Sequence, residues 1–398
     1  MGKVVAVIVV AVLVAAGAAH GSTPPTVSNV TASQRMDASK LVDIYYLLSD
    51  PDGATVVVRV KVSNDGGNIY NIIPVTMTGD VGEFVPVTPT PTQKHIVWNA
   101  GEDTPYTFGQ NFSVAVTAND CAGYTGEMIT IPAGPFLMGN NGHEGYSNDN
   151  ELPQHEVTLS DYQIGRYEVT RGEYRRFILA GGYETDGYWS DAGRVWRVAY
   201  NRTQPGYWAA QQNWGSLPGT FTQTDAHPVV GVTYYEAEAF CNWATASSGG
   251  GSAFHLPTEA QWEKAARWDA ATSTPRTYPW GDQWDASRCN NWDDALFPGS
   301  QTAPVGSYHP LGDSPYGCRD MAGNVWEWCK DWYGDTYYSQ PPPWVDPQGP
   351  ASSPDSYRVL RGGSWGSLDS LDSYCRCAYR SFTFPYDPYR VFGFRLAR

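Results

Sequence analysis

Residues 361–381, RGGSWGSLDSLDSYCRCAYRS, bring hydroxyl, carboxylate and thiol side chains together near the end of the chain. The GGSWG run fits the turn that exposes a nucleophilic serine in hydrolases, but that chemistry needs a helix after Ser364 and a later histidine. A polar run follows instead, and the last histidine of the chain is His309. A serine hydrolase is therefore a poor interpretation. Cys375 and Cys377 are two residues apart, so on a strand both thiols would point to one side.

Three helices that must help to position this segment are predicted by one signature, a threonine followed three residues later by Glu or Gln. The pairs are Thr170 with Glu173, Thr233 with Glu236, and Thr258 with Gln261. Each is a capping box, in which the two side chains satisfy backbone N–H groups at the helix start. The second helix should turn one apolar face to the core, formed by Ala237, Phe240, Cys241 and Ala244. Long Trp- and Gly-rich segments join the helices, and loops of this length are usually functional or braced by metal.

The region before these helices is predicted to be all-β. Val58, Val60 and Val62 alternate with Arg59, Lys61 and Ser63, which is typical of a half-buried strand. SDPDG and SNDGG are turn clusters at its ends, and HIVWNA and NFSVAVTAND read as further strands. We therefore expect an immunoglobulin-like or fibronectin-like β-sandwich over residues 22–121, acting as a spacer or adhesion module, and an α+β domain over residues 122–398.

The first residues, MGKVVAVIVVAVLVAAGAAHGS, combine a basic start, an apolar run and small residues at its end. This pattern predicts a signal peptide over residues 1–21, with an uncleaved membrane anchor as the alternative. No later stretch is apolar enough to cross a membrane, so we expect a secreted, periplasmic or cell-surface protein.

Net charge limits the class of partner, and the number of cysteines limits disulfide pairing. The net charge of −15 argues against nucleic acid, because binding phosphates requires a basic face. Export would permit disulfides, but seven cysteines cannot all pair within one chain.

The second domain resembles the formylglycine-generating enzyme (sulfatase-modifying factor) family. MITIPAGPFLMGN, HPVVGVTYYEAEAFCNWA, LPTEAQWEKAAR, DMAGNVWEW, RVLRGGSW and GFRLAR follow one another in the order seen in that family. The resemblance covers about residues 128–398 and implies a compact, irregular α+β fold related to C-type lectin-like proteins. It also places family half-cystines at Cys241 and Cys377, whose partner positions hold Leu396 and Ala266.

The family's best-known members oxidise a cysteine of a sulfatase to formylglycine with Cu(I) held by two thiolates. The ungapped spacing from GGS to GFR places those thiolate positions at Ser367 and Asp372, and the family's active-site serine at Ser364. Hydroxyl and carboxylate are hard ligands that suit Cu(I) poorly, so we do not expect copper there. Cys375 is a nearby thiol that a shifted loop could recruit.

The resemblance also implies calcium. In DMAGNVWEW the family ligands correspond to Asp320, Gly323, Val325 and Glu327, two carboxylates and two carbonyls that suit a hard cation. The alternative is a turn capped by Asp320 with the tryptophans in the core. A second family calcium site would begin at Asn290 and Asn291, but Phe297 occupies its acidic position, so Asp293 or Asp294 would have to replace it.

Aromatic side chains of the chain end are candidate ligand-binding residues: Tyr374, Tyr379, Phe382, Phe384, Tyr386 and Tyr389. Three functions remain open. The first is a non-catalytic exported protein that binds a protein, peptide or glycan. The second is a formylglycine-generating or other metal-dependent oxidase of the superfamily. The third is a variable binding protein diversified by a retroelement, since variable positions in such proteins lie just before a GFR motif.

Overall fold

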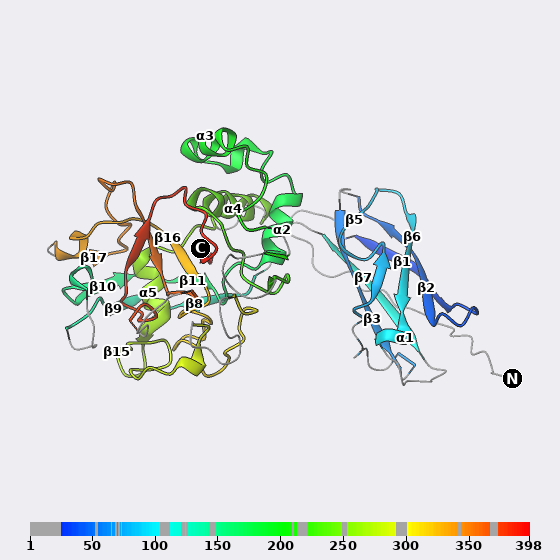
Figure 1. Cartoon of the computed structure of the whole chain (residues 1–398), viewed down its shortest axis with the longest axis horizontal. Helices are drawn as coiled ribbons and strands as arrows, with labels where there is room; N and C mark the ends of the chain where they lie inside the picture. The colour runs from blue at the N-terminus through cyan, green and yellow to red at the C-terminus, as the bar shows by residue number, and fades with distance from the viewer. Residues whose placement is uncertain are drawn as a thin grey trace. The chain divides into compact units, whose positions relative to one another are not determined.

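The computed structural model divides into two compact units, residues 1–123 and 124–398, which are drawn in Figure 1. The division lies two residues beyond the predicted boundary. The structure describes residues 25–51, 55–64, 66–67, 70, 72, 74–103, 112–120, 124, 126–142, 148–208, 211–212, 221–248, 253–291, 301–340, 344–366 and 373–398. Residues 1–21, the predicted signal peptide, lie outside this set. In the described residues no helix is long and apolar enough to cross a membrane.

The first unit is a two-sheet β-structure. One sheet has the order β1-β2-β6-β4 and the other the order β5-β3-β7. The strands are β1 (Thr26–Gln34), β2 (Leu41–Ser49), β3 (Thr55–Ser63), β4 (Met77–Gly79), β5 (Gly82–Pro86), β6 (Thr92–Asn99) and β7 (Ser113–Asp120), with a short helix α1 (Ala100–Asp103) after β6. Apolar residues of both sheets form one buried cluster, including Ile44, Val60, Ile96 and Val116. The alternation predicted for β3 is confirmed for its valines and wrong for Ser63, which is buried and accepts a hydrogen bond from Gly67 N.

The second unit is an irregular α+β structure with short strands. They are β8 (Met128–Ile131), β9 (Gly134–Met138), β10 (His155–Leu159), β11 (Tyr162–Gly165), β12 (Gln211–Gln212), β13 (Phe221–Thr222), β14 (Trp268–Asp269), β15 (Thr274–Pro275), β16 (Trp326–Trp332), β17 (Trp344–Val345), β18 (Arg358–Arg361), β19 (Ser381–Thr383) and β20 (Phe392–Gly393). The largest sheet of this unit has the order β19-β18-β16-β20. It places the RGGS segment, at the end of β18, beside the WEW segment of β16, with Glu327 opposite Arg361.

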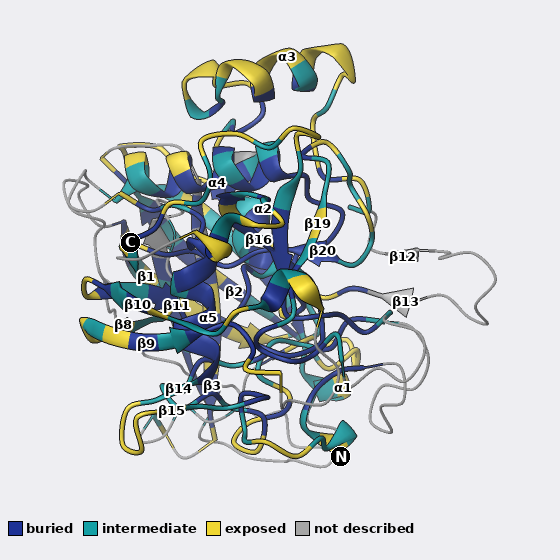
Figure 2. Ribbon diagram, turned by 90° about the vertical axis from the view of Figure 1, so that its left-hand side faces the viewer, coloured by how far each residue is buried: buried dark blue, intermediate teal, exposed yellow. Residues whose placement is uncertain are grey.

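In its described residues the second unit also has four α-helices: α2 (Arg171–Leu179), α3 (Asp191–Ala199), α4 (Tyr234–Ser247) and α5 (Glu259–Arg267). The capping boxes predicted for α2, α4 and α5 are all formed. The predicted apolar face of α4 lies in the main core cluster, so that prediction is also confirmed. Helix α3 buries only Gly193 and Arg197, and its outer face is exposed (Figure 2).

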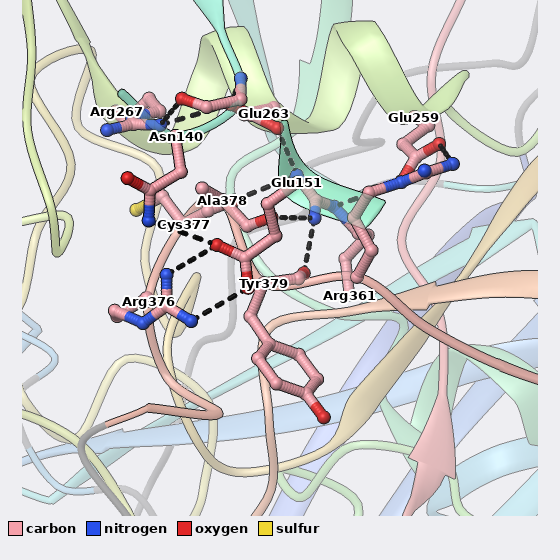
Figure 3. A network of polar contacts seen from close by, with 12 residues as sticks. Asn140, Glu151, Glu259, Glu263, Arg267, Arg361, Arg376, Cys377, Ala378 and Tyr379 are labelled. Carbon is pink, nitrogen blue, oxygen red and sulfur yellow. Dashed lines mark hydrogen bonds and ion pairs between the residues drawn. The ribbon is translucent and has the colours of Figure 1, made fainter. Parts of the chain in front are cut away.

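Buried arginine–glutamate pairs fix the end of the chain to the rest of the second unit. Arg376 forms two hydrogen bonds with Glu151, at 2.6 and 2.8 Å, and Arg380 forms two with Glu259, at 2.7 and 2.9 Å. Figure 3 shows Arg361 pointing between Glu263 and the backbone carbonyls of residues 377–379. Removing one partner of such a pair would leave a buried charge uncompensated, so these contacts define where the chain end lies.

Candidate functional site

The GGS turn after β18 requires both of its glycines. Gly362 and Gly363 have φ values of +96° and +75°, which L-residues with a side chain rarely adopt. A Cβ on Gly363 would lie 3.1 Å from Cys375 Sγ and 3.0 Å from Tyr374 O. Ser364 is buried, and its hydroxyl accepts a hydrogen bond from Gly366 N at 3.3 Å. The turn is therefore tightly closed against the segment that contains Cys375.

Asn324 connects this turn to three other segments. Trp365 N donates to Asn324 O, and Asn324 N donates to Asn290 O. The Asn324 side-chain oxygen accepts from Ala303 N at 2.9 Å and from Asn290 Nδ2 at 3.1 Å. Its nitrogen donates to Glu168 Oε1 at 3.1 Å. One buried amide thus joins residues that are up to 156 positions apart in the sequence.

Glu327 faces a buried arginine. Its two oxygens accept from Arg395 at 2.6 and 2.7 Å, and Oε2 also accepts from Trp262 Nε1 at 2.9 Å. Arg395 and Glu327 are both completely buried. Both oxygens of Glu327 therefore accept hydrogen bonds, but each keeps a further lone pair, so its role as a calcium ligand stays a prediction.

Two further buried carboxylates lie within electrostatic range of Glu327. Asp320, at φ +56°, accepts from Gly306 N, and burial raises its pKa to about 6. Burial also raises the pKa of Glu168 well above its usual range, and the charges of Asp320 and Glu327 raise it further. Among the described residues, Oε2 of Glu168 has no hydrogen-bond partner. Three carboxylates and Arg395 thus share this buried region, and the raised pKa values of Asp320 and Glu168 favour their protonated forms.

The residues of the predicted calcium sets lie in different surroundings. Asn290 donates to the side chain of Asn324, and a Cβ on the neighbouring Gly323 would lie 2.2 Å from Asn290 O. Asn290 Oδ1 is buried and has no partner among the described residues, whereas Asn291 donates to the carbonyls of Ala286 and Cys289. Val325 is buried in a small apolar cluster. Asp293, Asp294 and Phe297 lie outside the described residues. In the part of the chain that the structure describes, no group of three or more His, Cys, Asp or Glu side chains is arranged to hold a metal.

Glu168 was missed at the sequence level. It stands two residues before the N-cap of α2, in a segment whose local pattern predicts only a helix start. Nothing in that pattern indicates that its carboxylate contacts Asn324, because the contact depends on packing between distant segments.

The predicted copper positions, Ser367 and Asp372, lie outside the described residues. The nearby Cys375 is a free thiol, 1% exposed, in a buried cluster with Tyr278, Cys289 and Ala322.

The residues that the resemblance relates to two family disulfides are all buried. Cys241 and Leu396 lie in one core cluster, and Cys377 and Ala266 lie in another. At the two partner positions, Leu396 and Ala266 take the place of the cysteines that would complete the disulfides implied by the resemblance.

The predicted ligand-binding aromatics fall into three groups. Tyr374 and Tyr379 pack edge to face at 4.9 Å and both contact Trp326. Phe382 stacks on Tyr333 at 4.0 Å and Phe384 stacks on Tyr386 at 5.1 Å, and Tyr357 joins the two phenylalanines into one group. Tyr389 packs against Phe392. Phe382, Tyr386 and Tyr389 are 41%, 45% and 54% exposed, so these three rings offer surface to a partner.

Comparison with known proteins gives consistent matches over the second unit. The sulfatase-modifying factor enzyme 1-like domain family matches residues 113–398. Hercynine oxygenase of Mycolicibacterium thermoresistibile is 38% identical over 284 residues, which cover 69% of this chain and 59% of that protein. The formylglycine-generating enzyme of Streptomyces coelicolor is 36% identical over 295 residues, covering 68% of this chain and 88% of that enzyme. PvdO from Pseudomonas aeruginosa has a similar solved structure, with a TM-score of 0.50 and 26% identity over 69% of this chain and 94% of PvdO. The chain spans about three fifths of the length of the hercynine oxygenases that it matches.

Proposed function

Because this chain belongs to the sulfatase-modifying factor enzyme 1-like family, we propose that it is a non-catalytic, exported binding protein that presents residues 381–391 to a partner. The observation behind this proposal is the exposure of Phe382, Tyr386 and Tyr389 on a segment fixed at both ends. Arg380 is anchored by Glu259 before the segment, and Arg395 by Glu327 after it. Large aromatic side chains on a rigid support dominate many binding surfaces, because they bury much area at small entropic cost.

The residue types at the family's copper positions support a non-catalytic role. Serine and aspartate stand at 367 and 372, and neither suits Cu(I). Ser364, which the resemblance places at the family's active-site serine, and the nearby thiol Cys375 are each 1% exposed. We therefore derive no copper step at these positions.

An oxidase is the second candidate. It is favoured by 36% identity to a formylglycine-generating enzyme, over 88% of that enzyme's length. The names of the relatives describe those proteins, and the activity of this chain has to be tested directly.

The proposal that the protein is exported is based on the apolar run that follows Lys3 at the start of the sequence. Processing should give a mature N-terminus near Ser22, visible by mass spectrometry of the protein outside the cytoplasm. Intact Met1 on protein recovered from the cytoplasm would contradict export.

The catalytic alternative is tested with a cysteine-containing peptide of the sulfatase type, incubated with the full chain, copper and reductant. We expect no aldehyde mass shift on the peptide. Robust turnover would overturn the binding proposal in favour of the oxidase.

The binding role is tested with arrays of peptides and glycans, which cover the proposed partner classes. The triple variant Phe382→Ser, Tyr386→Ser, Tyr389→Ser should weaken any binding at least tenfold, a loss of about 1.4 kcal/mol. Tyr200→Ser, at a 68% exposed tyrosine beside α3, is the matched control and should bind normally. Unchanged binding by the triple variant would contradict the assignment of residues 381–391.

A further inference from the structure

Arg358, in β18, holds its guanidinium group between two aromatic rings. Its Cζ lies 3.4 Å from the centroid of the Trp332 ring and 4.0 Å from that of the Tyr234 ring. Two rings at these distances would overlap if both lay on the same side of the guanidinium, so they cover its opposite faces. The edge of the group, where its N–H donors point, is therefore left for polar partners.

This edge is only partly used within the part of the chain that the structure describes. Nη1 donates to the carbonyl of Lys330 at 2.6 Å, whereas the buried Nε has no hydrogen-bond partner there. Glu238 and Asp331 act on Arg358 electrostatically, but neither forms a hydrogen bond or an ion pair with it. Burial lowers the pKa of Arg358 below its usual value, as expected for a cation without a close counter-charge.

Arg358 lies beside residues 381–391, the segment to which we assign partner binding. In the sheet it is directly opposite Thr383 of β19, and Tyr234 N donates to the carbonyl of Pro385 at 3.0 Å. Among the described strands, β19 pairs only with β18 and is the last strand of its sheet. Such an edge can pair with an extended peptide through backbone hydrogen bonds.

We propose that Arg358 recognises a carboxylate of the partner, and that the partner is an acidic peptide in an extended conformation. This inference rests on the proposed binding function and adds the chemistry of the ligand. A carboxylate in the plane of the guanidinium would accept from Nη2 and supply the negative charge that Arg358 lacks. Because the rings of Trp332 and Tyr234 already fix the guanidinium, little side-chain entropy is lost when the carboxylate binds.

The open edge of β19 is the reason for choosing a peptide over an acidic glycan. Both ligands could present a carboxylate to Arg358, but a peptide backbone also matches the spacing of the hydrogen-bonding groups along a strand. The net charge of −15 repels acidic ligands in general, so a preference for acidic peptides has to come from a local cation.

The test uses the full chain and an array of short peptides. Each peptide with Asp or Glu is paired with its Asn or Gln counterpart, and each is made with a free and an amidated C-terminus. We expect the acidic form of a bound peptide to bind at least tenfold more tightly than its neutral form. Loss of binding on amidation alone would identify the terminal carboxylate as the group bound, and loss on Asp or Glu replacement a side chain. The change is made in the peptide, so this comparison does not depend on a variant folding.

Variants of the chain assign the effect to Arg358. Arg358→Gln, with its fold checked by near-ultraviolet circular dichroism, should remove the difference between the acidic and neutral forms. Arg358→Lys should keep only part of it, because an ammonium group lacks the planar fork. Arg194→Gln, at an arginine side chain of α3 that is 48% exposed, is the matched control and should keep the full difference.

The inference is overturned if acidic and neutral peptides bind alike, if the difference persists in Arg358→Gln, or if acidic glycans bind through Arg358 while peptides do not. Equal binding of both peptide forms through Phe382, Tyr386 and Tyr389 would leave the proposed function standing without this inference. Absence of binding to every peptide and glycan would contradict both.

Discussion

Glu168 is a buried carboxylate whose Oε2 has no hydrogen-bond partner among the described residues, and it lies within electrostatic range of Asp320 and Glu327. A calcium ion at this oxygen would relieve the repulsion between the carboxylates. We expect calcium to stabilise the protein by about 2.7 kcal/mol at a hundredfold excess over the dissociation constant. Chelation should lower the melting temperature, and Glu168→Gln should remove most of that response. Glu156→Gln, at an exposed position of β10, is the control and should respond to chelation as the wild type does. A melting temperature that does not change when the chelator is added would refute the prediction that calcium is bound.

Asp331, at the end of β16, gives a pH-dependent prediction. Burial, followed by the charge of Glu259, raises its pKa to about 7. The folded protein therefore retains a proton that the unfolded chain releases near pH 4. The stabilisation from this proton is complete below about pH 4 and is lost as the pH rises through 7. The difference corresponds to at most roughly 4 kcal/mol.

Asp331→Asn tests this effect, because the amide oxygen can still accept the hydrogen bond from Glu259 N, which the carboxylate accepts at 2.8 Å. In urea unfolding the wild type should lose stability relative to the variant between pH 5 and pH 8. Groups that titrate alike in the wild type and in Asp331→Asn contribute equally to both free energies of unfolding, so their contributions cancel in the difference. A gap that stays constant over that range would show that Asp331 titrates normally.

At the scale of the elements, the capping boxes differ in burial. Thr233 at the start of α4 is fully buried, and its hydroxyl donates to the buried Glu236 at 2.9 Å, whereas Thr170 at the start of α2 is partly exposed. Thr233→Ala should cost about 2 kcal/mol, because it removes a cap and leaves a buried carboxylate short of one donor. Thr170→Ala should cost about 1 kcal/mol. Urea unfolding of both variants checks the order, and equal losses would mean that burial of the cap is unimportant.

At the scale of the whole molecule, the family match and the structural units begin at different residues. The match starts at 113, which includes β7, whereas the second unit starts at 124. Val114 and Val116 of β7 are buried in the first unit, where the strand pairs with β3. A fragment of residues 124–398 should fold as a monomer. A fragment of residues 113–398 would expose β7 and should self-associate.

Size-exclusion chromatography and near-ultraviolet circular dichroism of the two fragments decide this point. Both fragments include Tyr124, which packs edge to face on Phe240 and Phe254 in the second unit. This aromatic packing should be retained in each fragment. If the longer fragment were monomeric and only the shorter one misfolded, the unit boundary would have to be moved before β7.

The sequence determined features that depend on neighbouring residues. The three capping boxes join residues three positions apart, and the valines of β3 alternate within one strand, so local pattern was sufficient to predict them. The ordered family motifs predicted the α+β fold, and their spacing predicts that Ser367 and Asp372 stand at the family's thiolate positions.

The tertiary structure decided which distant residues meet. Glu168 reaches Asn324 across 156 positions, and Cys289 shares a cluster with Cys375. The sequence motif predicts Glu327 as a calcium ligand, and the fold adds a buried ion pair with Arg395 that the motif does not indicate. The alternation of β3 predicts that Ser63 is exposed, but it is buried and accepts a hydrogen bond from Gly67 N. Such contacts arise because burial forces each polar group to find a partner wherever packing has placed one, and a local pattern does not contain that information.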